Sequence, residues 1–407
     1  MTAQATLEKE SLKGAASNYL SRIKSGDIGS LPAVLGLIAL IAVFGFMSEY
    51  FLTNRNFANL LTQAAPVMVI AMGLVFVLLL GEIDLSAGYA SGVCGAVLVL
   101  LVTDHGWSWY TALGMSIVVG AALGTFIGIL VSRLGIPSFV VTLAAFLAFQ
   151  GILLLLAGEG GTIPIADETI LAVENSNMTP MQGWILWAVA SALYVLSGLR
   201  RINSRRKAGL VVELTQLWAM KTFALLIITG VAVFQLNQER GLSETNSTKG
   251  VPYVAPLILV ILIAGTFLLS KTAFGRHIYA VGGNAEAARR AGINVKRVRT
   301  IAFVLCSSLA AVAGMLFASR MNSISPSTGG SSTLLYAVGA AVIGGVSLFG
   351  GKGRMRDAIL GGLVVAVIDN GMGLLGYGAG IQFLVTGAVL LVSAGVDAIS
   401  RRGALTN

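Results

Sequence analysis

Charged residues are scarce in this chain of 407 residues. They make up 11% of the sequence, and 56% of the residues are hydrophobic. Soluble domains carry about 25% charged residues, so an ordinary soluble protein of this length is excluded. Apolar stretches such as LPAVLGLIALIAVFGFM approach the roughly 20 residues that a helix needs to cross a bilayer. The composition therefore predicts an all-α, polytopic bundle of transmembrane helices.

The residue types that usually carry chemistry are few or isolated. The two cysteines, Cys94 and Cys306, fall inside apolar runs and imply no disulfide framework. His105 and His277 are far apart in the sequence and have no neighbours that resemble metal ligands, so we expect no metal site. The sequence contains no nucleophile triad, metal cluster or dinucleotide fingerprint.

A phosphate loop for nucleotide binding is also missing. Such a loop needs Gly-x₄-Gly-Lys-Ser/Thr, because the hydroxyl group holds magnesium. The nearest stretch, GGVSLFGGKGRM, has Val346 where the first glycine is required and Gly353 where the hydroxyl is required. We therefore expect a chain that is not an enzyme and that binds no cofactor.

Apolar runs predict about twelve membrane spans, with boundaries that are soft by several residues. The spans are expected near 31–49, 57–80, 88–104, 109–132, 134–157, 183–199, 217–236, 252–270, 300–318, 334–351, 357–376 and 381–399. This division leaves an N-terminal tail at 1–30, a membrane domain at 31–399 and a C-terminal tail at 400–407. An even number of spans places both tails on the same side.

The net charge of +9 is better explained by topology than by nucleic-acid binding. Cytoplasmic loops of membrane proteins are enriched in lysine and arginine. With the N-terminus inside, the cytoplasmic segments hold Arg200–Lys207, Arg289–Arg299, Lys352–Arg356, Arg401 and Arg402. The loop 158–182 on the opposite side carries four acidic residues and no basic one, although Arg55 and Arg320 are exceptions to the asymmetry. We predict two cytoplasmic termini, contact with membrane lipid, and no nucleic-acid partner.

A face of small residues marks the span 109–132. Gly120, Gly124 and Gly128 stand four residues apart, so they share one side of the helix. In a bilayer, small faces let helix backbones approach closely. We expect this face to pack within the chain rather than to form a dedicated dimer seam.

A short basic helix is predicted between two apolar spans, in the stretch VGGNAEAARRAGI. Asn284 is suited to cap its N-terminus, and Glu286 in the first turn favours the helix dipole. Arg289 and Arg290 occupy the last turn, and Gly292 suits the left-handed position that ends a helix. The alanines of this helix, Ala285, Ala287 and Ala288, give it a low profile. These features favour insertion into a groove of another protein.

The alternative for this helix is a position on the lipid surface, held by its basic residues. Interfacial helices usually carry Trp, Phe or Leu as anchors, and this stretch has none.

Carboxylates near membrane depth are the next unusual feature. GEIDLSAG places Glu82 and Asp84 just beyond a long apolar run, and Ser86 follows. A carboxylate at the bilayer centre costs about 2.5–3.5 kcal/mol, so such residues are often functional. The stretch is either a water-lined break that belongs to a pathway or gate, or a polar cytoplasmic turn in which Asp84 or Ser86 caps the next helix.

Asp369 and Asn370 lie well inside the span 357–376. An acid there should face the bundle interior or a cavity, which makes the pair pathway or gate candidates. The alternative is a structural hydrogen bond between helices. Gln63 and Gln150 are weaker instances of the same pattern.

The chain resembles permeases of the ABC-type sugar importers, the ribose/xylose/galactose group. The similarity follows EIDLSAG, PSFVVTLAAFLAFQGI, TAFGRHIYAVGGNAEAARRAGINVKRVR, SRMNSISPSTG, AAVIGGVSLFGGKGR, DNGMGLLG and TGAVLLVSAGVDA, in this order over most of the chain. Ribose-type permeases have about ten spans, whereas two further spans are predicted here around 183–236. That insert and the acid of GEIDLS make the chain look most like the xylose-type branch.

This resemblance implies a transport subunit of a bacterial inner membrane. Two permease copies would form the pathway, a separate cytoplasmic ATPase would hydrolyse ATP, and an extracytoplasmic sugar-binding protein would deliver a pentose or hexose. The loop 271–300 would dock on the ATPase, with Asn284, Glu286, Ala287, Ala288, Arg289, Arg290 and Gly292 as its coupling residues. Glu82, Asp84, Ser86, Asp369 and Asn370 would be the pathway or gate candidates.

Two other functions remain compatible with parts of the sequence. A proton-coupled secondary transporter would use Glu82, Asp84 or Asp369 as its proton site, but this function leaves the capped basic helix unexplained. A membrane scaffold or receptor would move no sugar even with an ATPase and a binding protein present.

Overall fold

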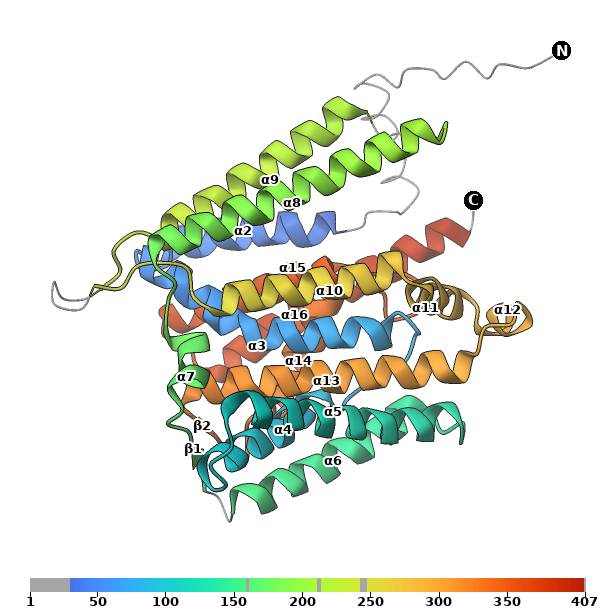
Figure 1. The fold of residues 1–407 in the computed structure, drawn as a ribbon, viewed down its shortest axis with the longest axis horizontal. Coiled ribbons are helices and arrows are strands. Elements are labelled where there is room, and N and C mark those ends of the chain that lie inside the picture. Colours follow the sequence, from blue (N-terminus) through green and yellow to red (C-terminus); the bar gives the residue numbers. More distant parts are fainter. Residues whose placement is uncertain (1–29, 159–160, 211–213, 242–246, 406–407) are drawn as a thin grey trace. The chain divides into compact units, whose positions relative to one another are not determined.

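The computed structural model describes residues 30–158, 161–210, 214–241 and 247–405 (Figure 1). The predicted N-terminal tail thus lies almost wholly outside the described residues. The first helices are α2 (Leu31–Met47), α3 (Asn54–Leu78), α4 (Ala87–Thr103), α5 (Trp109–Ser132), α6 (Ser138–Ala157) and α7 (Glu168–Asn175). The middle helices are α8 (Pro180–Lys207), α9 (Thr215–Leu236) and α10 (Val254–Lys271). The last are α11 (Ala273–Gly283), α12 (Ala285–Arg290), α13 (Val295–Met321), α14 (Ser331–Gly344), α15 (Met355–Leu374) and α16 (Ala379–Leu405).

The prediction of a polytopic helical membrane protein is confirmed. Within the described residues, eight helices are long and apolar enough to cross a membrane. Four shorter apolar helices, α2, α4, α14 and the first part of α16, lie at the positions of the remaining predicted spans. The described strands are β1 (Ile163–Pro164) and β2 (Ser323–Ile324), which form one antiparallel pair.

The chain divides into two compact units. The larger unit comprises residues 30–177 and 252–397, and the smaller includes residues 178–251. In the smaller unit, α8 and α9 pack together through the ring of Trp218 at Gly198 and a hydrogen bond from Trp187 Nε1 to Thr229 Oγ1 of 3.0 Å.

Helices α3 and α13 form the centre of the larger unit. Nearly every side chain from Ala64 to Leu80 is buried. Helix α13 packs against α3, α4 and α5, and its Ala302, Phe303, Ala310 and Leu316 are inaccessible to solvent. A helix buried on most of its surface inside a membrane protein must pack against other helices rather than lipid, and the small residues of α13 permit this.

The small face of α5 packs against α13, which confirms the prediction of a seam within the chain. A Cβ atom at Gly120 would lie 2.5 Å from the carbonyl oxygen of Ser307, and one at Gly128 would lie 2.8 Å from Thr300 Cα. A Cβ at Gly124 would meet the carbonyl oxygen of Phe303. The two backbones are therefore too close for any larger residue.

Gly124→Leu is expected to lower the stability of the chain by about 1–3 kcal/mol or more, because overpacking of a tight contact forces the helices apart. Gly114→Leu on the same helix is the control, since a Cβ at Gly114 has no atom within 4 Å. Thermal unfolding of the purified protein in detergent measures the difference. Equal melting temperatures for the two variants would show that the α5–α13 seam is not tightly packed.

Two predicted boundaries differ from the structure. The basic stretch Arg200–Lys207 was expected in a loop, but α8 continues through it from a capping box at Thr179 and Gln182. The stretch contains no Gly or Pro to stop the helix before Gly209, where φ is +67°. The span expected at 334–351 ends at Gly344, because Gly345 has a φ of +115°.

The two ends of the larger unit are different in character. Helices α11 and α12 project at one end, and α7 and the β1–β2 pair lie at the other (Figure 1). The basic residues of α12 therefore lie far from the acidic segment around α7, as the charge asymmetry of the sequence predicts.

Candidate functional site

Helix α12 has both of its ends specified by its own residues, as predicted. The Asn284 side chain accepts a hydrogen bond of 2.9 Å from the Ala287 amide, so it is the N-cap. Glu286 forms ion pairs of 2.8 Å with Arg289 and 3.2 Å with Arg290. The hydrogen bonds from these two arginines lower the pKa of Glu286. Gly292 has a φ of +84°, the left-handed geometry that favours glycine.

One side of α12 is exposed and the other faces the protein. Ala288 is buried at 5% exposure and its carbonyl accepts the Ile293 amide, so it anchors the helix. Glu286, Ala287, Arg289 and Arg290 are exposed. The exposed side of α12 therefore has a small side chain, Ala287, at its centre and two arginines at one end.

Three backbone segments meet at the end of α11, just before α12, and we call this meeting point the glycine junction: Leu79, Gly282, Gly350 and Gly351. The Gly351 amide donates a hydrogen bond of 2.8 Å to the Leu79 carbonyl. A Cβ at Gly282 would meet the same carbonyl oxygen. The end of α11, the end of α3 and the loop after α14 are thereby held in direct backbone contact.

Glu82 connects the same region to α13. Its Oε1 atom lies 3.1 Å from Arg299 Nε, and its side chain is only 14% exposed. Arg299 stands in the second turn of α13, directly after the segment that follows α12. The start of α13 is therefore joined by an ion pair to the segment between α3 and α4.

Asp84 is fully buried at the start of α4. Its Oδ1 atom accepts hydrogen bonds of 2.9 Å from the Ser86 amide and 2.6 Å from the Ser86 hydroxyl. The Cys306 thiol of α13 lies beside the carboxyl group. Asp84 therefore holds the turn before α4 by local bonds to Ser86 inside the bundle, while the Ser86 side chain makes no capping hydrogen bond to the helix.

The start of α4 packs against a second non-helical segment, the one that precedes α14. Helices α4 and α14 have 17 and 14 residues, fewer than the roughly 20 that a full crossing needs. A Cβ at Gly88 would meet the carbonyl of Gly329, and one at Gly92 would meet that of Thr328. The residues 328–330 before α14 are thus covered by the start of α4, the condition under which non-helical backbone survives at membrane depth.

Asn370 and Asp369 have different surroundings. Asn370 exchanges amide hydrogen bonds of 2.8 and 2.9 Å with Asn56 and donates a longer one of 3.3 Å to Gln63. These bonds join α15 to α3. For Asn370 this is the structural hydrogen bond between helices that was the alternative to a pathway role. Asp369 instead interacts electrostatically with Arg320.

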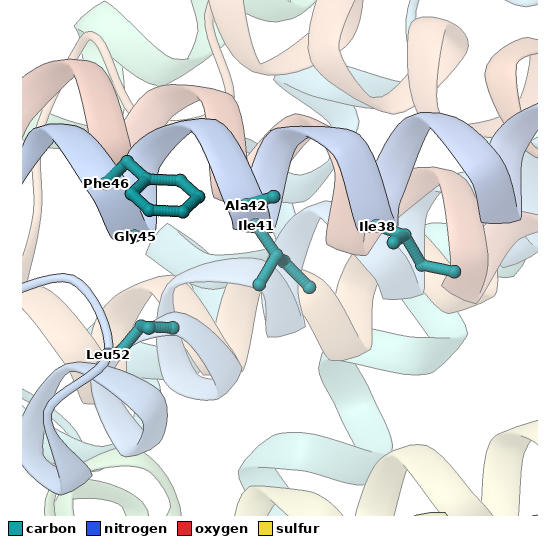
Figure 2. Close-up of a pocket in the computed structure, with 6 residues that line it drawn as sticks. All are labelled: Ile38, Ile41, Ala42, Gly45, Phe46 and Leu52. Atoms are coloured by element: carbon teal, nitrogen blue, oxygen red, sulfur yellow. The ribbon is translucent and has the colours of Figure 1, made fainter.

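A groove along α2 has no polar group to offer a substrate. Figure 2 shows this groove, with a volume of about 330 Å³. Its lining residues are Ile38, Ile41, Ala42, Gly45, Phe46 and Leu52. Such a surface suits lipid chains and cannot form the hydrogen bonds that a hydrophilic substrate requires.

Comparison with known proteins identifies the chain. Residues 56–394 match the family described as branched-chain amino acid transport system / permease component. The chain belongs to this permease family. The permease is 34% identical to the xylose transport system permease protein XylH of Escherichia coli K12, over 95% of this chain and 96% of the relative. It is equally similar to XylH of Haemophilus influenzae, over 92% and 98%.

A second group of relatives is more distant. The ribose import permease protein RbsC of Escherichia coli K12 is 28% identical over 90% of this permease and 92% of its own length. No solved structure matches the permease significantly. The family resemblance stated from the sequence motifs is therefore confirmed.

Three residues in this geometry received no individual role from the sequence. Gly282 was part of the capped stretch, Arg299 was counted with the basic loop, and Arg320 was an exception to the charge asymmetry. For Arg320, its place on the acidic side could have identified it, because an arginine there needs a nearby acidic partner.

Proposed function

We propose that the permease is the membrane subunit of an ATP-driven sugar importer, with a pentose or hexose similar to xylose as substrate. A separate ABC ATPase would hydrolyse ATP, an extracytoplasmic sugar-binding protein would deliver the sugar, and two permease copies would form the pathway. The supporting observation is the exposed, capped helix α12 in a chain that is 34% identical to a xylose permease over 95% of its length. In this proposal the permease lies in a bacterial inner membrane, with both termini in the cytoplasm.

Coupling would proceed from α12 into the bundle by two routes. The ATPase groove would hold the exposed side of α12, with Glu286, Ala287, Arg289 and Arg290 as contacts and Asn284, Ala288 and Gly292 as residues that shape the helix. The glycine junction and the Glu82–Arg299 ion pair then connect α12 with the segment 79–86. Displacement of that segment would move α4, whose start is fixed by Asp84 and Ser86.

The membrane domain in this proposal is a core of ten spans with α8 and α9 as an insert. Gating would involve Glu82, Asp84 and Ser86 at one break and Asp369 and Asn370 in the outer half. Because Asn370 holds α15 on α3, its part would be to fix the position of Asp369.

Reconstitution in vesicles tests the proposal directly. The permease, the ATPase and the binding protein encoded with it are combined in proteoliposomes, and uptake of radiolabelled D-xylose is followed. We expect uptake only with ATP and all three proteins. Accumulation by the permease alone under a proton gradient would instead establish the proton-coupled transporter, and no flux with every component present would favour a scaffold.

Ala287→Trp is expected to reduce uptake about tenfold or more, because a loss of about 1.4 kcal/mol in docking free energy is a factor of ten. Ala287 is exposed at the centre of the proposed contact, so a large ring there blocks the groove without disturbing the core. Ala379→Trp, at an exposed alanine that begins α16, is the control. Co-purification of the ATPase with each variant measures docking, and unchanged co-purification with Ala287→Trp would contradict the role of α12.

A further inference from the structure

Arg320 at the far end of α13 lies near two carboxyl groups from other helices. It interacts electrostatically with Glu174 of α7 and with Asp369 of α15. Among the described residues, its guanidinium group makes no hydrogen bond and no ion pair of 4.0 Å or less. Five N–H donors are thus half-buried near two acids without direct contact to either.

Glu174 is held in this group by the packing of α7. Its backbone amide donates a hydrogen bond of 3.0 Å to Ser319 Oγ, and the Ser319 hydroxyl donates one of 3.1 Å to the Leu171 carbonyl. The Asn175 side chain donates a bond of 2.7 Å to the Ser319 carbonyl. Helix α7 is therefore fixed to the end of α13, directly beside Arg320.

The carboxyl group of Glu174 has unused hydrogen-bonding capacity. The side chain is 5% exposed, and neither of its oxygen atoms has a hydrogen-bond partner among the described residues. Burial raises the pKa of Glu174 to about 9, with Arg320 opposing the shift. At neutral pH the group is therefore a carboxylic acid, which both donates and accepts a hydrogen bond.

An aromatic ring completes the group. Tyr336 of α14 interacts electrostatically with Asp369, and the Thr386 side chain of α16 lies beside its hydroxyl. The Tyr336 ring is also 6.2 Å from that of Phe383, measured between centroids. Donors, acceptors and an aromatic face thus converge from five helices at the end of the bundle opposite α12.

We propose that Glu174, Arg320, Asp369 and Tyr336 form a subsite for a neutral sugar on the outer half of the permease. The proposal rests on the proposed function and assigns the place where sugar released by the binding protein is first held. Buried polar groups without partners cost free energy, so a ligand that supplies partners is favoured. A sugar carries hydroxyl groups that both donate and accept, which matches a guanidinium group that interacts with two carboxyl groups.

The competing explanation is a charge lock that only holds α7, α13 and α15 together. A lock would satisfy the charges by direct ion pairs, whereas no such pair joins Arg320 to either acid in the described part of the chain. The two explanations also differ in a measurable way, because only a subsite contacts the sugar.

Saturation-transfer NMR on the purified permease in detergent tests the subsite, with D-xylose as the probe. Tetrahydropyran, which has the same ring without hydroxyl groups, reports non-specific partitioning. We expect the wild type to transfer saturation to D-xylose, and Arg320→Gln to weaken binding about tenfold or more, the effect of removing a hydrogen bond to a charged group. Arg297→Gln, at an exposed arginine at the other end of α13, should bind D-xylose as the wild type does.

Thermal unfolding of each variant separates loss of the site from loss of the fold. Should Arg320→Gln not fold, Arg320→Lys and Asp369→Asn take its place. Absence of saturation transfer in the wild type, or wild-type binding by folded Arg320 and Asp369 variants, overturns the subsite. The measurement needs neither ATP nor partner proteins, so its failure is distinct from a failure of ATP-driven uptake, which would instead contradict the proposed function.

Discussion

Replacing Gly282 by alanine is expected to abolish sugar uptake by the assembled transporter. A Cβ atom at this position would collide with the carbonyl oxygen of Leu79 and lie 2.8 Å from the Gly351 amide nitrogen. Both neighbours are backbone atoms, which cannot turn away as a flexible side chain does. The end of α11 would be forced from the glycine junction, and the hydrogen bond between Gly351 and Leu79 would be broken.

The size of this effect follows from the position of the contact. Overpacking of a close contact costs about 1–3 kcal/mol, and here the displaced segment also carries α12. We therefore expect a lower melting temperature and a loss of uptake of more than about tenfold, since about 1.4 kcal/mol corresponds to a factor of ten. ATP hydrolysis by the complex should continue, because the fault lies between α12, the proposed docking helix, and the bundle.

Gly283 provides a matched control one residue away. A Cβ at Gly283 has no atom within 4 Å, and the residue ends the same helix. Gly283→Ala should therefore retain uptake and stability. If the Gly282→Ala and Gly283→Ala variants have the same uptake and melting temperature, the glycine junction does not couple α12 to the bundle.

The positions of the helices were largely predictable because apolar runs decide them. Each of the twelve predicted spans coincides with an apolar helix, and the boundaries move by a few residues at caps such as Thr53 and Gly345. The short helices α7 and α11 were not predicted. Helix α7 depends on the Asp167 cap and its tertiary contacts with Ser319, and α11 depends on burial of Ile278 and Val281.

The local geometry of α12 was also predictable, since each of its features is set by residues within it. Asn284, Glu286 and Gly292 act over a single turn, so their pattern in the sequence identifies the helix ends. The burial of Ala288 depends instead on contacts with the rest of the bundle, and no local pattern distinguishes it from Ala287.

Depth in the bundle could not be predicted for GEIDLSAG. A cap at a polar surface and a cap at a buried break use the same residues at the same spacing, so Asp84 and Ser86 fit both. The difference comes from Gly88 and Gly92, which bring α4 against the segment before α14. Contacts between segments more than 200 residues apart are invisible to a local pattern, and the Glu82–Arg299 pair is a further example.

Reversal of one charge in the Glu82–Arg299 pair is expected to impair uptake strongly, and reversal of both to restore it in part. Glu82→Arg would place two cations side by side, and Arg299→Glu would place two carboxylates side by side. Arg299 is 31% exposed and Glu82 14%, so water screens the pair only partly. A contribution of about 1–3 kcal/mol lies between the values for exposed and buried pairs.

Transport should respond more than stability if the pair transmits motion from α12. Each single reversal is expected to lower uptake about tenfold or more, as about 1.4 kcal/mol is a factor of ten. The double variant Glu82→Arg with Arg299→Glu re-forms the attraction and should recover a large share of the rate. Glu168→Arg, at an exposed acid on α7, controls for a change of net charge.

The decisive quantity is the interaction energy from this double-mutant cycle, measured for uptake and for thermal unfolding of the same four proteins. Coupling in uptake that exceeds coupling in stability means that the pair acts during the transport cycle. Equal coupling in both would make the pair a structural clamp, and additive effects without recovery would mean that the two charges do not act on each other. Because Glu82 precedes Asp84 by two residues, the first outcome also connects α12, the proposed docking helix, to the buried start of α4.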